Sequence, residues 1–345
     1  MKKHVLLGVV LASGAAWAAE APKTQAPNVQ DGPPPWAWGY TTPAPPGPPT
    51  EFTPQPPAAP LKADDPKHTL PGSKFSFSRG EANNRYAPAD WFPEDHPAMP
   101  PIVSHGRENA NPTIYACALC HMPNGHGRPE NAAVNALPYD YILRQLEDFK
   151  AGHRRSSDPR KTNTSVMESF TRAMTEDEMK QAAAYFAAIP ATPWIKVVES
   201  ATVPKTRTAG GVFFALEGKE AGTEPLGARI IEMPLNNDDF EKWRNPHSGF
   251  VAYVPQGSVA KGKALVTTGG GKTTACTVCH GADLRGLGPV PRLANRSPSY
   301  VARQLYDMQH GNRIGAWMPL MAPVIEKLTP DDVLNISAYL ASLEP

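Results

Sequence analysis

Apolar residues recur every three or four positions after Thr175 and again after Thr329, and this period predicts an amphipathic helix at each place. Each helix has a start signal. Glu178 completes a capping box with Thr175, and Pro330 suits the first turn after Thr329. The predicted buried stripes are Met179, Ala183 and Phe186 in the first helix, and Val333, Ile336 and Leu340 in the second.

A further pair of helices is predicted upstream of the first pair, and both carry the pattern Tyr-x-x-Arg-Gln-Leu. Pro138 and Pro298 stand where a first helical turn tolerates the missing N–H, and Gly152 and Gly311 stand as C-terminal caps. Each of these helices is expected to span about 13 residues. The two pairs indicate two small modules that are mostly helical.

Three short apolar runs between the two helical regions have a different character. They cover residues 211–216, 228–231 and 250–254, and turn residues bound each of them. Runs of this length and setting predict strands. We therefore expect a small β-containing insert at residues 201–257.

The first residues have the three parts of a secretory signal peptide. Lys2 and Lys3 precede a twelve-residue apolar run at 5–16, and Ala16-Trp17-Ala18 is a small-x-small cleavage site. A membrane anchor is the alternative, but the run is well short of the roughly 20 residues that cross a bilayer. Residues 1–18 are thus predicted to be a signal peptide, and the mature chain is expected in the periplasm.

Proline dominates the next segment, residues 19–89, with 16 Pro between positions 22 and 71. This density blocks helices and sheet ladders and favours polyproline II or disorder. Trp36, Trp38 and Tyr40 would anchor such an arm on a partner if it is a docking strip, whereas a plain spacer needs no anchor.

The charge of the chain is nearly balanced, with 34 Lys and Arg against 33 Asp and Glu in 345 residues. This argues against a nucleic-acid partner, because such affinity comes from clustered basic residues. The length suggests two domains.

All four cysteines lie in two copies of C-x-x-C-H, at 117–121 and 276–280, and this motif is the attachment sequence of c-type haem. Two thiols at this spacing can add to the two vinyl groups of one porphyrin, and the adjacent His121 or His280 then binds the iron. A zinc site would need the two pairs to meet across 159 residues, and disulfides within Cys117–Cys120 or Cys276–Cys279 would close loops too tight to stabilise much. The expected cofactors are two covalently bound haem c groups with iron.

An internal repeat extends beyond the motifs. At an offset of 159, the Tyr-x-x-Arg-Gln-Leu helices and the Gly-x-Arg turns after them coincide. The offset then becomes 154, and Met167 coincides with Met321. Each Met lies eight residues before the capping Thr, on a segment expected to be irregular.

Met167 and Met321 are the predicted distal ligands, because a thioether is soft and His/Met ligation raises the reduction potential. Packing is the alternative for either Met. Other residues remain as competing ligands, and they are Met174, Met318, His105, His126, His153 and His310.

These motifs in this order resemble the two-domain dihaem class I cytochromes c of bacteria. The resemblance covers residues 97–192 and 258–345 and implies two tandem helical domains, each wrapped around one haem, at residues 90–200 (module 1) and 258–345 (module 2). The insert (201–257) and the Pro-rich arm (19–89) are departures from the family's compact chain.

Filled iron positions favour outer-sphere electron transfer, so the sequence predicts a periplasmic electron carrier. Its expected partners are redox proteins, such as members of a respiratory or dehydrogenase complex. We expect no nucleic-acid partner and no segment that spans a bilayer. The alternative is a dihaem oxidoreductase, a peroxidase or a small-substrate dehydrogenase, with an open iron at the first haem. His126 or Glu130 would then be the acid–base group.

Overall fold

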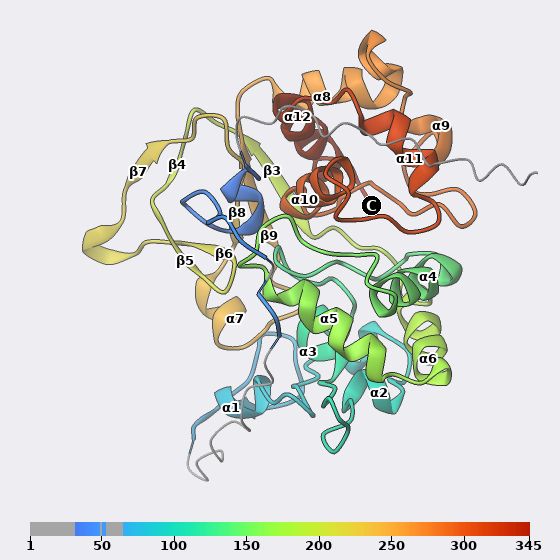
Figure 1. Cartoon of the computed structure of the whole chain (residues 1–345). Helices are drawn as coiled ribbons and strands as arrows, with labels where there is room; N and C mark the ends of the chain where they lie inside the picture. The colour runs from blue at the N-terminus through green and yellow to red at the C-terminus, as the bar shows by residue number, and fades with distance from the viewer. Residues whose placement is uncertain (1–31, 49, 53–64) are drawn as a thin grey trace, which may run out of the picture. The chain divides into compact units, whose positions relative to one another are not determined.

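The computed structural model describes residues 32–48, 50–52 and 65–345. The predicted signal peptide lies outside the described residues, as does part of the Pro-rich arm. Figure 1 shows helices in both modules and strands between them. Within the described ranges, no helix combines the length and the apolar character needed to cross a membrane.

Both predicted helices of module 1 are present. α4 (Tyr139–Lys150) begins directly after Pro138, and Gly152 takes a φ of 72° just beyond its end, in the left-handed region that favours glycine. α6 (Glu176–Ala187) starts at the predicted capping box on Thr175. The other helices of module 1 are α2 (Pro101–Ser104), α3 (Cys117–His121) and α5 (Thr162–Ala173).

Both predicted helices of module 2, α10 (Pro298–Gln309) and α12 (Pro330–Ala341), are also present. An additional helix, α8 (Ser258–Thr268), packs along α12. Gly262 makes this close crossing possible, because a Cβ atom there would lie only 1.9 Å from the carbonyl oxygen of Asn335. The remaining helical elements of module 2 are η4 (Gly269–Gly271), α9 (Thr277–His280) and α11 (Met318–Ile325).

The two methionines proposed as ligands lie on helices and not on irregular segments, so that part of the prediction is wrong. Met167 is in α5, and Met321 is in α11. In α5 the apolar residues Val166, Met167 and Phe170 fall on one face, a helical spacing that the polar neighbours obscure. The side chains of both methionines are therefore held by helix geometry.

Strands occupy most of the region between the modules. The main sheet has the order β3-β9-β8, with β9 parallel to β3 and antiparallel to β8. Two antiparallel ladders, β4-β7 and β5-β6, adjoin it. The first strand of this region begins at Ile195 and not after residue 201. The predicted runs 211–216 and 250–254 correspond to β6 and β9, whereas the run 228–231 shares only Ile231 with β8, so the prediction of a strand there is wrong by three residues. The elements are β3 (Ile195–Glu199), β4 (Thr202–Pro204), β5 (Thr206–Ala209), β6 (Val212–Ala215), η3 (Gly218–Glu220), β7 (Thr223–Pro225), β8 (Ile231–Pro234), α7 (Asn237–Glu241) and β9 (Phe250–Val254).

The described part of the arm differs from the extended or disordered segment that its proline content predicts. Pro35–Trp38 form a 3-10 helix, η1, and Trp38 is completely buried. This helix, blue in Figure 1, packs against α10. The proline pattern gives stiffness, but the two tryptophans add enough apolar surface to make burial favourable. Trp36 and Trp38 are thus anchors within this chain's own core.

A second ordered part of the arm, together with the first residues of module 1, forms a small layer with its own apolar cluster. Trp91 and Phe92 are its largest buried members, and Trp91 donates its indole N–H to the carbonyl of Trp243, 2.8 Å away in the insert. The elements of this layer are β1 (Lys67–His68), β2 (Phe77–Ser78), α1 (Arg79–Ala82) and η2 (Pro93–Asp95).

The larger cores divide the chain unequally. One core consists of residues of module 1 alone, between Ile102 and Ile189. The other combines module 2 with the insert, the tryptophans of η1, and Met122, Trp194 and Ile195 of module 1. Module 2 therefore shares its core with segments that lie outside the repeat.

Candidate haem sites

Each C-x-x-C-H motif forms a short helix, α3 in module 1 and α9 in module 2, that ends at a residue of positive φ. This residue is Met122, with a φ of 64°, and at the equivalent position of the repeat it is Gly281, with a φ of 87°. No disulfide joins any of the four cysteines. Burial raises the pKa of the Cys117 thiol to about 12 and that of Cys276 to about 11. The motifs are thus helical turns that present two thiols and a histidine.

Both histidines of the motifs are oriented in the same way. Nδ1 of His121 lies 2.8 Å from the carbonyl oxygen of Ala132, and Nδ1 of His280 lies 2.8 Å from that of Pro291, the equivalent residue of the repeat. A carbonyl only accepts, so Nδ1 carries the proton and the Nε2 lone pair is available to a metal. Burial lowers the pKa of both imidazoles, which favours the neutral ligand form.

Module 1 contains a cavity of about 320 Å³ beside α3. Cys117, Cys120 and His121 line it, and so do Met167 of α5 and Met174 directly after α5. The predicted thiols, histidine and methionine are therefore brought together around one space. The remaining lining is mainly apolar, and it includes Ile114, Leu119, Leu137, Ile142, Leu146, Phe149, Phe170 and Phe186.

The polar lining of this cavity fits a haem, whose two propionates are anionic. Lys161 is 5% exposed and lines the cavity, and its Nζ has no hydrogen-bond partner among the described residues. Burial lowers the pKa of this amine well below its usual value, and Arg303 adds to the effect. An incoming carboxylate would supply the missing partner and restore the charge. Arg154 and Arg303 also line the cavity.

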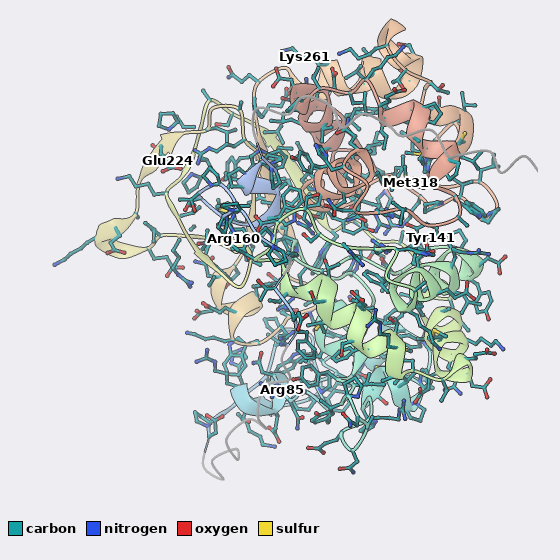
Figure 2. All side chains as sticks on the ribbon, viewed as in Figure 1. Arg85, Tyr141, Arg160, Glu224, Lys261 and Met318 are labelled. Carbon is teal, nitrogen blue, oxygen red and sulfur yellow. The ribbon has the colours of Figure 1, made fainter. Side chains whose placement is uncertain are left out.

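Module 2 holds its motif at the surface. Cys279 is exposed, and Val278 beside it is 65% exposed. Met321 is half-buried on α11, three residues after Met318, which stands at the start of that helix (Figure 2). Exposed apolar side chains surround this region, namely Leu287, Ile314, Trp317 and Leu320.

The competing histidines have other partners. Nε2 of His126 is 2.7 Å from the Thr192 hydroxyl, and its ring stacks on Trp194 at 4.5 Å. Burial lowers the pKa of His126 to about 3. Of the remaining three, His105 contacts the Ser104 hydroxyl, His153 lies 3.6 Å from a carboxylate oxygen of Asp148, and His310 stacks on Tyr306.

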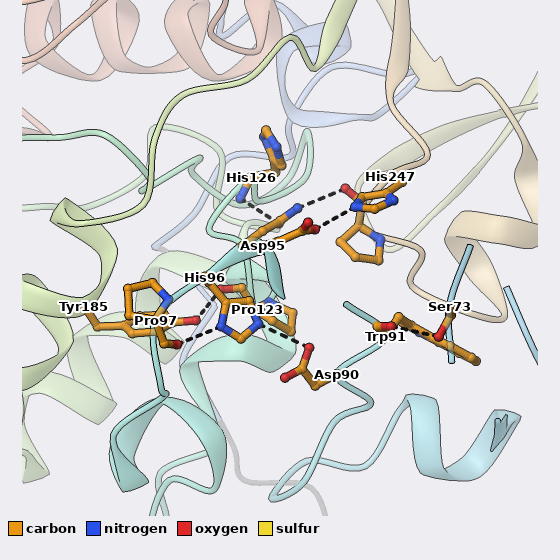
Figure 3. Close-up of polar contacts among 12 residues, drawn as sticks. Ser73, Asp90, Trp91, Asp95, His96, Pro97, Pro123, His126, Tyr185 and His247 are labelled. Carbon is orange, nitrogen blue, oxygen red and sulfur yellow. Dashed lines mark hydrogen bonds and ion pairs between the residues drawn. The ribbon is translucent and has the colours of Figure 1, made fainter. Parts of the chain in front are cut away.

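Segments outside the repeat hold the chain that follows the first motif. Asn124 donates its side-chain N–H to the carbonyl of Pro246 in the insert, at 3.0 Å. His247, the next residue of the insert, pairs with Asp95 at 2.6 Å (Figure 3). The same close-up shows His96 paired with Asp90, 3.2 Å away. The contacts of Asn124 and His247 were not readable from the sequence, because they join segments more than 100 positions apart.

The two modules meet through equivalent residues of the repeat. Arg154 donates to Oε1 of Gln304 at 2.6 Å, and Arg313 donates to Oε1 of Gln145 at 2.8 Å. Arg154 and Arg313 also face each other in an antiparallel bridge. This reciprocity is what a two-fold axis produces between identical surfaces. The Tyr141 hydroxyl, on the residue labelled in Figure 2, accepts a further hydrogen bond from Arg313 at 3.0 Å.

Module 2 also forms one wall of the module 1 cavity. Tyr300, Arg303 and Gln304 of α10 line it together with Tyr141, Gln145 and Arg154 of module 1. The recurrence of Tyr-x-x-Arg-Gln-Leu and Gly-x-Arg in both copies was the sequence signal for these residues. The pattern could not reveal that they face one another.

The chain is similar to several known proteins, and these similarities identify its family. Residues 259–344 match the family model described as cytochrome c. The chain is 32% identical over 152 residues to cytochrome c4 of Stutzerimonas stutzeri, and the match covers 70% of that protein and 37% of this chain. It is 25% identical over 240 residues to a thiosulfate dehydrogenase electron acceptor of S. stutzeri strain A1501, and this match covers 82% of that protein and 68% of this chain.

A solved structure of thiosulfate dehydrogenase (TsdBA) from Marichromatium purpuratum is similar over 67% of this chain, with 25% identity and a TM-score of 0.43, and the chain spans 37% of that protein's length. The attachment motifs, the family match and the cytochrome c4 relative lead to one conclusion. The chain belongs to the cytochrome c family, as a bacterial dihaem class I cytochrome c.

Proposed function

We propose that this protein carries electrons in the periplasm through two haem c groups, each bound by a C-x-x-C-H motif and each with His/Met ligation. The observation that carries the proposal is the cavity of module 1, where Cys117, Cys120, His121 and Met167 line one space. When bound, each haem supplies a one-electron Fe(III)/Fe(II) couple. Cys276, Cys279, His280 and Met321 are the equivalent residues of module 2.

The protein's own groups would prepare each site in the same way. The carbonyls of Ala132 and Pro291 fix the tautomer of His121 and His280, which would leave the Nε2 lone pair free to bind an iron. With a His and a Met both bound to it, the iron would have no place for a substrate, and its chemistry would be electron exchange. In module 1 the apolar walls of the cavity would exclude water and keep the reorganisation small.

The junction of the modules supports transfer between the two haems. Residues of α10 line the module 1 cavity, so the wall of one haem site belongs to the module that carries the other. Tyr300 and Arg303, in the first half of α10, form part of this wall. We propose that electrons cross the protein at this junction.

The partners are proposed to be redox proteins. One relative is named a thiosulfate dehydrogenase electron acceptor, which makes a dehydrogenase of a small sulfur compound the first electron donor to test. The alternative function, a dihaem oxidoreductase with an open iron at the first haem, requires that Met167 is not a ligand. Of its two suggested acid–base groups, His126 contacts Thr192 and Trp194, and Glu130 pairs with Arg128 at 2.6 Å.

Optical and magnetic spectra of the exported ferric protein test the proposal. We expect two low-spin haems, and we expect Met167→Ala and Met321→Ala each to remove half of the thioether-to-iron absorption band. Met174→Leu and Met318→Leu are matched controls, because they change the neighbouring methionine of each site and should leave the band intact. A high-spin or bis-His signal in the unmodified protein, or loss of the band only in the controls, would contradict the ligand assignment.

A further inference from the structure

The insert reaches the first attachment motif through Arg244. Its guanidinium donates to the carbonyl of Leu119, which lies between the two cysteines of the motif, and its Nε donates to the Asn83 side chain at 2.7 Å. Arg244 has a φ of 50°, a left-handed conformation that is rare for a residue with a side chain and that surrounding contacts must hold in place. The insert thus fixes a cation against the motif.

A second cation, Arg128, lies beside the first. Its side chain is 15% exposed, it pairs with Glu130 at 2.6 Å, and its guanidinium stands over the ring of Phe240 in α7 at 5.1 Å. Burial lowers the pKa of Arg244 to about 9, and the nearby guanidinium of Arg128 adds to this effect, so the two guanidiniums interact. Glu130 lines the module 1 cavity together with Cys120 and His121, so this acid and its partner Arg128 also lie at the motif. Two positive charges therefore face one negative charge at this motif.

The equivalent turn of module 2 lacks these charges. The bridge between Arg128 and Asn131 recurs there as a bridge between Leu287 and Val290, so Leu287 takes the position of Arg128. Pro289 takes the position of Glu130 in the repeat. The difference between the two motifs is thus electrostatic, and part of it comes from a segment outside the repeat.

We infer that Arg244 of the insert raises the reduction potential of the haem attached at Cys117 and Cys120. Ferric iron carries one positive charge more than ferrous iron, so a fixed cation in a partly dry site favours the reduced state. Loss of this charge should shift the reduction equilibrium about tenfold, which is 59 mV for a one-electron couple. The inference rests on the proposed function, because it requires a haem at each motif.

A spectroelectrochemical titration of the exported dihaem protein tests the inference. Met167→His first identifies the wave of the module 1 haem, since exchange of a thioether for an imidazole lowers its potential strongly. Arg244→Gln should lower the reduction potential of this haem by an amount that corresponds to a tenfold change in the equilibrium constant. The potential of the other haem should not change. Arg207→Gln is the matched control, because it removes the same charge from the insert at an exposed side chain paired with Glu241.

Two more variants separate charge from structure. Arg244→Lys keeps the charge and should keep the potential, whereas Glu130→Gln removes the opposing acid and should raise the potential of the module 1 haem. The inference is overturned if Arg244→Gln changes neither reduction potential. It is also overturned if Arg244→Lys lowers the potential of the module 1 haem as much as Arg244→Gln does. If Arg244→Gln yields no folded protein, Glu130→Gln decides by the presence or absence of the rise. Failure of Met167→His to move a wave would instead contradict the ligand assignment of the proposed function.

Discussion

Module 1 and module 2 present the same five-residue motif to very different surroundings. Ala118 and Leu119, between the cysteines of module 1, are 3% and 7% exposed, whereas Val278 of module 2 is 65% exposed. The histidine geometry is nevertheless the same in both, with 2.8 Å between Nδ1 and the equivalent carbonyl. The repeat therefore preserves the ligand geometry, while segments outside the repeat determine how dry each site is.

The helices before the motifs show a related difference. Module 2 begins with α8, eleven residues long, which crosses α12 at Gly262. Module 1 has only α2, four residues long, against α6. The layer formed by residues 65–100 and the insert cover the chain after the motif of module 1. Module 1 is thus completed by added segments, and module 2 by a helix of its own.

Removal of the attachment thiols should break this comparison with the largest effect. Cys117→Ser with Cys120→Ser, and Cys276→Ser with Cys279→Ser, should each reduce the mass of the exported protein by one haem. We expect the first pair to reduce the yield of folded protein and the thermal midpoint far more, because its cavity is enclosed by both modules. The second pair of substitutions removes the haem of module 2, whose motif lies at the surface, and should therefore lower the thermal midpoint less.

Mass spectrometry and thermal unfolding of the two variants provide the measurement. Equal loss of stability in both would show that enclosure of the motif has no energetic consequence. Retention of both haem masses in either variant would contradict covalent attachment at these cysteines.

The elements with strong local signals were predictable from the sequence. The capping box at Thr175, Pro330 in the first turn after Thr329, and the glycines after α4 and α10 define their helices within a residue or two, because these signals act over a single turn. The second capping box, between Thr329 and Asp332, was not predicted. The motif histidines were likewise readable. Their Nδ1 partner was not, since it depends on a turn eleven residues further along the chain.

The sequence failed where tertiary burial decides the structure. The arm around Trp38 has the composition of a disordered linker, and only the surface of both modules provides a place to bury its tryptophans. The helical state of Met167 and Met321 was missed because polar and proline residues hide the apolar spacing of α5 and α11. Arg244 was missed because its partner, Leu119, is 125 positions away.

The contribution of the arm gives the next largest expected effect. Trp38 donates its indole N–H to the Ser156 hydroxyl of module 1 at 2.9 Å, and its ring meets that of Tyr306 in module 2 at 5.6 Å. Trp38→Ala should therefore lower the free energy of unfolding by about 3–5 kcal/mol in a denaturant titration. Phe75→Ala is a control from the same arm, because Phe75 is 43% exposed and its loss should change the free energy by about 0.5 kcal/mol or less. A Trp38 effect as small as the control would show that the arm is only a spacer.

The junction of the modules gives the smallest expected effect and the sharpest test of their equivalence. Arg154→Met and Arg313→Met should each lower the free energy of unfolding by about 1.5–3 kcal/mol, the range for a hydrogen bond to a charged group. Double-mutant cycles with Gln304→Leu and Gln145→Leu isolate the two cross-module bonds, which measure 2.6 and 2.8 Å.

If the repeat places the same interaction on both sides of its two-fold axis, the two coupling energies should agree within about 0.5 kcal/mol. Arg144→Met is the matched control, because Arg144 is half-exposed and lies 3.7 Å from Glu147 on the surface of α4. Unequal coupling energies would mean that the surroundings that distinguish the two motifs also reach this junction. In that case the difference between the modules would extend from the surface of module 2 to the contact through which electrons are proposed to pass.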